Sequence, residues 1–240
     1  MMKKQSKKHK FKLNFVTNAI IFTMLALVSI ITFNPTIQSV LGSKTISPIY
    51  NGNRNHNNVT LMFNVYWGSE YIEPILDVLK TNNITTTFFV GGQWVEKEPE
   101  LLKKIYSNGH EIGNHGYFHK EHKNLSYNQN KEEISYCHTL VSKNIDFDMN
   151  LFAPPSGSFS QTTLDVASEL GYKTIMWSKD TIDWRDKDIN LVYTRATKNI
   201  KGGDLVLMHP TKHTLDALPQ IISYYNSINM KVVTVSENLK

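Results

Sequence analysis

The sequence VTLMFNVYWG, at residues 59–68, is a short apolar run that ends in polar and small residues, and six similar runs follow it. They span residues 84–90, 111–113, 151–153, 173–177, 204–208 and 231–235. Between them lie segments with the apolar spacing of amphipathic helices: residues 70–80, 99–108, 130–143, 161–170, 190–199 and 213–226. Such alternation predicts parallel strands covered by helices. A distorted (β/α) barrel of about seven parallel strands suits the count, and an open doubly wound sheet fits the same pattern.

The N-terminal part of the chain has the features of a membrane anchor. Residues 1–14 are basic, and residues 15–33 are apolar apart from five polar residues, which is long enough for a transmembrane helix. Lysines before this stretch predict a cytoplasmic N-terminus, and therefore a single-pass cell-membrane protein with an extracytoplasmic C-terminal domain. A cleaved signal peptide is the competing interpretation, but its apolar part is usually only about 7–15 residues long. Residues 34–58 are predicted to be a linker, and residues 59–240 the folded domain.

Charge and cysteine content exclude several classes of protein. Of 26 basic residues, six lysines precede residue 13, which leaves 20 basic against 21 acidic residues and a net charge of −1. A nearly neutral body predicts no nucleic-acid partner. The single cysteine, Cys137, cannot form an intramolecular disulfide or a thiolate metal cluster, and we interpret it as a structural thiol.

Polar residues follow five of the predicted strands, at residues 64–68, 115–119, 154–157, 180–184 and 209–210. Functional groups of parallel α/β folds collect at the carboxyl ends of the strands, so these residues are expected to meet at one end of the barrel. His115 and His119 are four residues apart, and one helical turn would let both bind a zinc-like ion. An isolated H-x-x-x-H is equally compatible with a solvated polar loop.

With these residues in place, the sequence resembles the polysaccharide deacetylase family, carbohydrate esterase family 4, over nearly all of residues 59–238. Its motifs H-[ST]-x-x-H, D-x-x-D-W and L-x-L-H are similar to residues 115–119, 180–184 and 205–209, with Gly116 in place of the hydroxyl residue. The motifs T-F-D-D-G and R-P-P-x-G correspond to residues 62–68 and 153–157 in altered form. The altered first motif resembles the sporulation-associated branch of the family, found in spore-forming Gram-positive bacteria.

Membership of this family would imply a seven-stranded distorted barrel that hydrolyses the N-acetyl group of an amino sugar, giving acetate and a free amine. The resemblance implies that His115 and His119 bind a divalent metal such as zinc, and that His209 is the general acid. It implies that Asp183 orients His209. The substrate-binding residues implied are Trp184, Pro154 and Pro155.

Three positions depart from the family pattern. Asn64 stands at the position of the catalytic base, and an amide cannot accept a proton at neutral pH. Val65 stands at the position of the metal-binding aspartate and Ala153 at that of the arginine, so we expect a metal site that is weak or absent. His122 or Glu70 is a hypothetical replacement ligand.

Two function classes follow from this residue set. The first is a membrane-anchored enzyme that hydrolyses carbon–nitrogen bonds of N-acetylated cell-envelope glycan, such as peptidoglycan. The second is a catalytically silent relative that binds glycan or serves as a scaffold during spore or envelope assembly. A third, purely structural interpretation is that the remaining His and Asp residues only join strand ends. The sequence leaves the oligomeric state and the particular glycan open.

Overall fold

The computed structural model describes residues 2–33 and 46–240, which belong to two compact units, Met1–Thr45 and Ile46–Lys240. The first unit contains α1 (Met2–Phe33), a continuous helix of 32 residues. Among the described residues, no helix combines the length and the apolar character that crossing a membrane requires. The anchor at residues 15–33 stays a prediction, and residues 34–45 of the predicted linker lie outside the described residues.

The second unit is built on a sheet whose strand pairs are all parallel, with β1 (Asn58–Val65) at its centre. The strand order is β5-β4-β3-β2-β1-β7-β6, and β8 pairs with the beginning of β1. The other strands are β2 (Thr87–Val90), β3 (Glu111–Asn114), β4 (Leu151–Phe152), β5 (Lys173–Thr174), β6 (Lys179–Asp180), β7 (Leu205–Met208) and β8 (Lys231–Val232).

The order of the strands shows that this sheet curls into a barrel. β5 and β6 form its two ends, yet only residues 175–178 separate them in the chain, so the two ends must come close together. Ile49 bridges to Ile175 beside β5, with its amide donating to the Thr174 carbonyl at 2.9 Å. The predicted distorted barrel is confirmed, and the open doubly wound sheet is not found. The structure adds one strand, β6, which the sequence pattern did not reveal.

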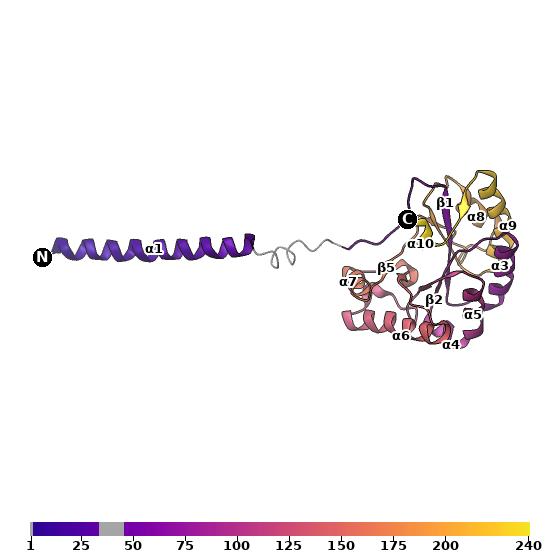
Figure 1. Ribbon diagram of the computed structural model, residues 1–240, viewed down its shortest axis with the longest axis horizontal. Helices are drawn as coiled ribbons and strands as arrows, with labels where there is room; N and C mark the ends of the chain where they lie inside the picture. The colour runs from indigo at the N-terminus through magenta and orange to yellow at the C-terminus, as the bar shows by residue number, and fades with distance from the viewer. Residues whose placement is uncertain (1, 34–45) are drawn as a thin grey trace. The chain divides into compact units, whose positions relative to one another are not determined.

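Helices cover the barrel in two groups, with α3, α8 and α9 packed together on one flank and α4, α6 and α7 on the other (Figure 1). The helices of the body are α3 (Ser69–Thr81), α4 (Gly92–Lys97), α5 (Pro99–Ser107), α6 (Tyr127–Ile145), α7 (Gln161–Glu169), α8 (Ile189–Thr197), α9 (Lys212–Ser227) and α10 (Val235–Asn238). Helix α6 begins with a capping box, because the Ser126 hydroxyl accepts the Gln129 amide and the Gln129 side chain accepts the Ser126 amide. Sequence spacing predicted six of these helices and missed the short α4 and α10.

The body begins earlier than the sequence suggested. Residues 46–58, interpreted as linker, belong to the second compact unit. Arg54 forms a 2.6 Å ion pair with the nearly buried Asp204, and Asn51 bridges to the same residue. This segment therefore closes one side of the barrel instead of only joining it to α1.

The alternation of side chains along β1 determines which of its residues reach the functional end. Phe63 and Val65 are fully buried in the apolar core between the sheet and the helices, whereas Met62 belongs to the smaller core inside the barrel. Because successive strand residues point to opposite faces, Asn64 points to the barrel interior as Met62 does. Asn64 is therefore the residue that β1 presents at the barrel mouth.

Candidate active site

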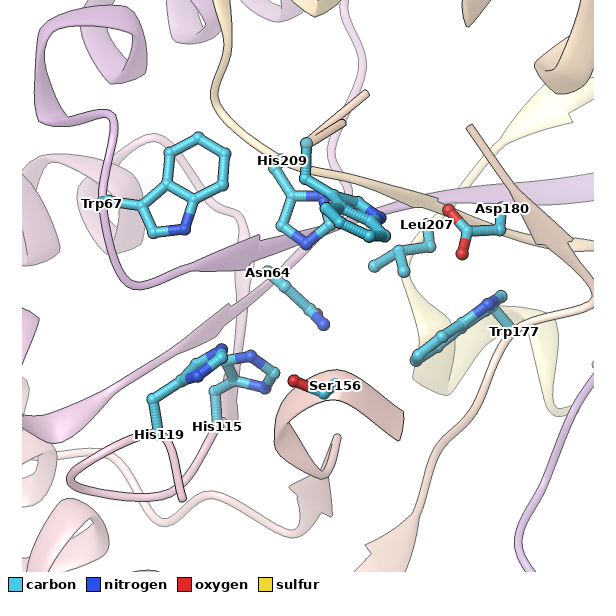
Figure 2. Close-up of a pocket in the computed structure, with 10 residues that line it drawn as sticks. Asn64, Trp67, His115, His119, Ser156, Trp177, Asp180, Leu207 and His209 are labelled. Carbon is cyan, nitrogen blue, oxygen red and sulfur yellow. The ribbon is translucent and has the colours of Figure 1, made fainter. Parts of the chain in front are cut away.

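A cavity of about 570 Å³ opens at the carboxyl ends of the strands, and residues from all five predicted polar spots line it (Figure 2). The lining residues that the sequence analysis named individually are Asn64, His115, His119, Trp184 and His209. Those that complete the lining are Trp67, Ser156, Trp177, Asp180 and Leu207. The polar spot at residues 154–157 contributes Ser156. The expectation that the polar spots meet at one end of the barrel is confirmed.

Asp183 is buried behind the cavity wall and pairs with His209, which lines the cavity. The His209 ring donates from Nδ1 to Asp183 Oδ1 at 2.7 Å, and the His209 backbone amide donates to Asp183 Oδ2 at 2.7 Å. The Thr214 hydroxyl donates to the same Oδ2 at 2.5 Å. Since a carboxylate only accepts, Nδ1 carries the proton and Nε2 is free to face the cavity. The orientation of His209 by Asp183 is thus present, as the family pattern implies.

His115 and His119 lie side by side, with their ring centroids 5.1 Å apart. The Ala153 carbonyl accepts a hydrogen bond from His115 Nδ1 at 2.7 Å, which leaves Nε2 of His115 unprotonated. Burial is the main cause that lowers the pKa of both rings, and the neighbouring His209 lowers them further. Both imidazoles therefore stay neutral near pH 7 and offer lone pairs.

Asn64 and Val65 have different surroundings. Asn64 lines the cavity with only 4% of its surface exposed, and its Oδ1 is buried without a hydrogen-bond partner in the described chain. Val65 is fully buried in the core that faces the helices. Neither side chain supplies a carboxylate to the site.

The altered R-P-P-x-G motif, residues 153–157, contributes a single residue to the cavity lining. Ala153 is fully buried inside the barrel, and Pro154 and Pro155 are buried as well, whereas the exposed Ser156 lines the cavity. Ser156 has a positive φ of 55°, which turns the chain at this point. A substrate-binding role for Pro154 and Pro155 stays a prediction, and Ser156 is the side chain of this loop that a ligand would meet.

The residues present fit a divalent metal poorly. Within residues 46–240, no group of three or more His, Cys, Asp or Glu side chains is placed to hold an ion. His122 is fully buried with its Nδ1 on Asn130 Oδ1 at 2.7 Å, and Glu70 lines a neighbouring cavity of about 560 Å³. Neither replaces the missing carboxylate beside His115 and His119, so that hypothesis is wrong for the described residues. His115 and His119 offer two neutral imidazoles, and no carboxylate among the described residues is placed with them to offset the dehydration of an ion.

We expect the purified protein, dialysed against metal-free buffer after exposure to zinc, to retain far less than stoichiometric zinc. The physical reason is that closed zinc sites in proteins use about four ligands, and catalytic ones about three, whereas two neutral ligands are found here. Elemental analysis of the dialysed protein measures this directly. A stoichiometric ion that is lost on changing His115→Ala would contradict the expectation.

The loop that carries the two histidines is held by a buried carboxylate that the motifs did not reveal. Glu133 on α6 is 3% exposed and accepts the backbone amides of Tyr117 at 3.0 Å and Phe118 at 2.8 Å. Lys120 pairs with its other oxygen at 3.2 Å. His119 itself adopts a positive φ of 56°, which these contacts help to stabilise. No sequence motif marks Glu133, because its partners are main-chain atoms of a distant loop.

Aromatic side chains form much of the cavity wall. The Trp67 ring stacks on His209 with centroids 5.6 Å apart and an interplanar angle of 7°. Trp67 and Trp184 are 43% and 54% exposed, and Trp177 lies beside Asp180 across the cavity from His115 (Figure 2). Burial raises the pKa of Asp180, although its carboxylate also accepts the Ile182 amide at 2.8 Å. Flat, partly exposed rings around a few polar groups are typical of carbohydrate sites.

Comparison with known proteins agrees with the motifs. A family model described as polysaccharide deacetylase matches residues 51–175. "Uncharacterized protein YlxY" of Bacillus subtilis (strain 168) is 37% identical over 190 residues, covering 79% of this chain and 60% of that protein. This chain thus spans less than two thirds of that relative. "Peptidoglycan-N-acetylmuramic acid deacetylase PdaA" of the same strain is 32% identical over 179 residues, covering 72% of this chain and 68% of that protein.

Solved structures show the same relationship. BA3943 from Bacillus anthracis, described as a CE4 family pseudoenzyme, has a TM-score of 0.80 and 35% identity, covering 83% of this chain and 71% of that one. A mutant of BA3943 described as having restored enzymatic activity also has a TM-score of 0.80, at 34% identity, covering 83% and 74%. Since the family model matches more than half of this chain, including Asn64, His115 and Ala153, the chain belongs to the polysaccharide deacetylase family.

Proposed function

We propose that this protein binds N-acetylated glycan of the cell envelope in the cavity at the barrel mouth, and hydrolyses it at most slowly. The observation that carries the proposal is the combination at one site of an aromatic cavity with Asn64 and Val65. The wall that holds a sugar is kept, while the base and the metal carboxylate are replaced. The printed name of PdaA, a deacetylase of peptidoglycan N-acetylmuramic acid, supports the choice of glycan.

The chemistry of the site argues against efficient hydrolysis. Attack on an acetamide needs an activated water, and the Asn64 amide cannot take a proton from it. A positioned general base contributes about 10²–10⁴-fold to the rate. The poor fit of a divalent metal removes a second source of activation. His209, oriented by Asp183, could still protonate a leaving amine, but that step follows the attack that the site does not promote.

The alternative function is a slow de-N-acetylase of the same glycan, and the retained His209–Asp183 pair favours it. The two functions differ in one observable, the release of acetate. A protein that only binds needs His209 as a wall or a hydrogen-bonding group, whereas an enzyme needs it as a proton donor.

We expect no acetate release from N-acetylated chitooligosaccharides or peptidoglycan fragments, with or without added zinc, cobalt or manganese, while the same ligands bind. Trp184→Ala should weaken binding about tenfold, because a sugar face stacked on an aromatic ring contributes on the order of 1 kcal/mol or more. Calorimetric titration measures the affinity and an acetate assay the turnover. Tyr136→Ala is a matched control, since Tyr136 is as exposed as Trp184 but does not line the cavity. Brisk metal-dependent acetate release by the natural chain would contradict the proposal.

We propose further that residues 15–33 anchor the protein in the cell membrane, with the body outside the cytoplasm. The lysine-rich residues 1–14 before the apolar stretch support this orientation, as does the location of the glycan outside the membrane. We expect the full chain to stay in the membrane pellet after alkaline carbonate washing and to be digested by protease added to intact protoplasts. Recovery in the soluble fraction, or protection from external protease, would contradict this location.

A further inference from the structure

The Asn64 amide has no hydrogen-bond partner within the described chain. Its Oδ1 is buried and unpaired, and its amide nitrogen points into the cavity between the histidines and Trp177 (Figure 2). Polar groups of buried residues are nearly always paired in folded proteins, so the amide nitrogen, which faces the cavity and has no partner in the described chain, calls for an acceptor on a ligand. Leu207 and three tryptophans make much of the surrounding wall apolar. A hydrogen bond between this amide and a ligand is therefore well protected from water.

His115 supplies the complementary group at the same cavity. Its Nδ1 hydrogen is donated to the Ala153 carbonyl, so the nitrogen left for the cavity, Nε2, is an acceptor. Asn64 thus offers N–H donors and His115 offers an acceptor, and both residues line one cavity. A ligand group that satisfies both must carry one acceptor and one donor.

Resting on the glycan binding proposed above, we propose that Asn64 is a specificity-determining residue that selects the intact acetamido group over a free amine. The acetyl carbonyl would accept from the Asn64 amide nitrogen, and the acetamido N–H would donate to His115 Nε2. Replacement of the base by an amide therefore does more than remove a catalytic group. The amide makes this position a hydrogen-bond donor to the acetyl carbonyl, beside the carbon–nitrogen bond that an active family member would break.

The charges around the cavity distinguish this group from its two charged competitors. A carboxylate on the sugar would face the His115 lone pair and the Asp180 carboxylate, which repel it. An ammonium group is attracted by Asp180 and could donate to His115 Nε2, but it has no acceptor for the Asn64 N–H groups and would leave them unpaired. The uncharged acetamido group meets neither conflict.

The test compares two probes, tetra-N-acetylchitotetraose and the same tetrasaccharide fully deacetylated, titrated into the purified full chain in the presence of a chelator. We expect the natural chain to bind the acetylated probe at least about tenfold more tightly, which is the weight of one well-made buried hydrogen bond. Asn64→Asp, whose carboxylate cannot donate, should bind the acetylated probe about tenfold more weakly and the deacetylated probe more tightly. Asn64→Leu should bind the acetylated probe more weakly without binding the deacetylated probe more tightly.

Exposed Asn128, in the first turn of α6 and away from the cavity, gives the matched control, because Asn128→Asp makes the same chemical change. Equal binding of both probes by the natural chain overturns the role of Asn64 but leaves glycan binding standing. Binding of neither probe overturns both proposals. Unchanged probe preference in Asn64→Asp and Asn64→Leu, each shown to be folded by circular dichroism, also overturns the role of Asn64.

Discussion

Replacing Asn64 and Val65 by aspartate and Ala153 by arginine in one chain is expected to create metal-dependent release of acetate from N-acetylated oligosaccharides. The barrel, the His115–His119 pair and the His209–Asp183 pair are already in place, so the three substitutions supply the groups that the site lacks. The gain should reach about 10²-fold or more over the natural chain, since a general base alone contributes on the order of 10²–10⁴. A mutant of BA3943, a structural relative, is described as having restored enzymatic activity.

The three substitutions are expected to depend on one another. Val65 and Ala153 are both fully buried, so Val65→Asp or Ala153→Arg alone places an unpaired charge in a dry environment and should destabilise the fold by about 3 kcal/mol or more. Together with Asn64→Asp, the arginine gains a carboxylate partner, and bound metal offsets the carboxylate at position 65. Stability should therefore recover partly in the triple variant, and recover further when zinc is added.

Acetate release, zinc content and urea denaturation of the single, double and triple variants measure these effects. Adding His119→Ala to the triple variant is the control, because it should abolish both the bound zinc and the new activity. If the triple variant is folded and loaded with zinc but remains silent, then more than these three residues separates this cavity from an active one.

The fold was predictable from the sequence because its strands are apolar runs and its helices are amphipathic over several turns. β6 (Lys179–Asp180) escaped detection because a two-residue polar strand carries no apolar pattern, although its second residue, Asp180, begins the well-marked residues 180–184. Short helices such as α4 (Gly92–Lys97) span too few residues to show a periodicity. Residues 46–58 have the composition of a linker, and their place in the body depends on contacts with Thr174 and Asp204 that lie far along the chain.

The candidate site was predictable where a residue type implies its own chemistry. Histidines and acids after strands are conspicuous, so His115 and His209 could be assigned to the barrel mouth from the pattern alone. Trp177 was placed in a strand, and its role as a wall follows only from the turn between β5 and β6. Glu133 and the unpaired amide of Asn64 could not be recognised, because their meaning lies in partners, present or missing, that only the folded chain defines.

Asp183→Ala should destabilise the body by about 3–5 kcal/mol, the usual cost of leaving one partner of a buried pair alone. Asp183 is 1% exposed and accepts from the His209 ring, the His209 backbone amide and the Thr214 hydroxyl. Its removal leaves all three donors without a carboxylate, and no water can easily replace it in so buried a position.

Urea denaturation of the natural and variant chains measures the loss, and Asp180→Ala is the control. Asp180 lies three residues earlier, is only half-buried, and has a single hydrogen bond, from the Ile182 amide, so its removal should cost about 1 kcal/mol. A loss for Asp183→Ala no greater than for Asp180→Ala would show that the pair is not structural. The large expected difference means that Asp183 and His209 would be retained for folding alone, so their presence cannot by itself be taken as a sign of catalysis.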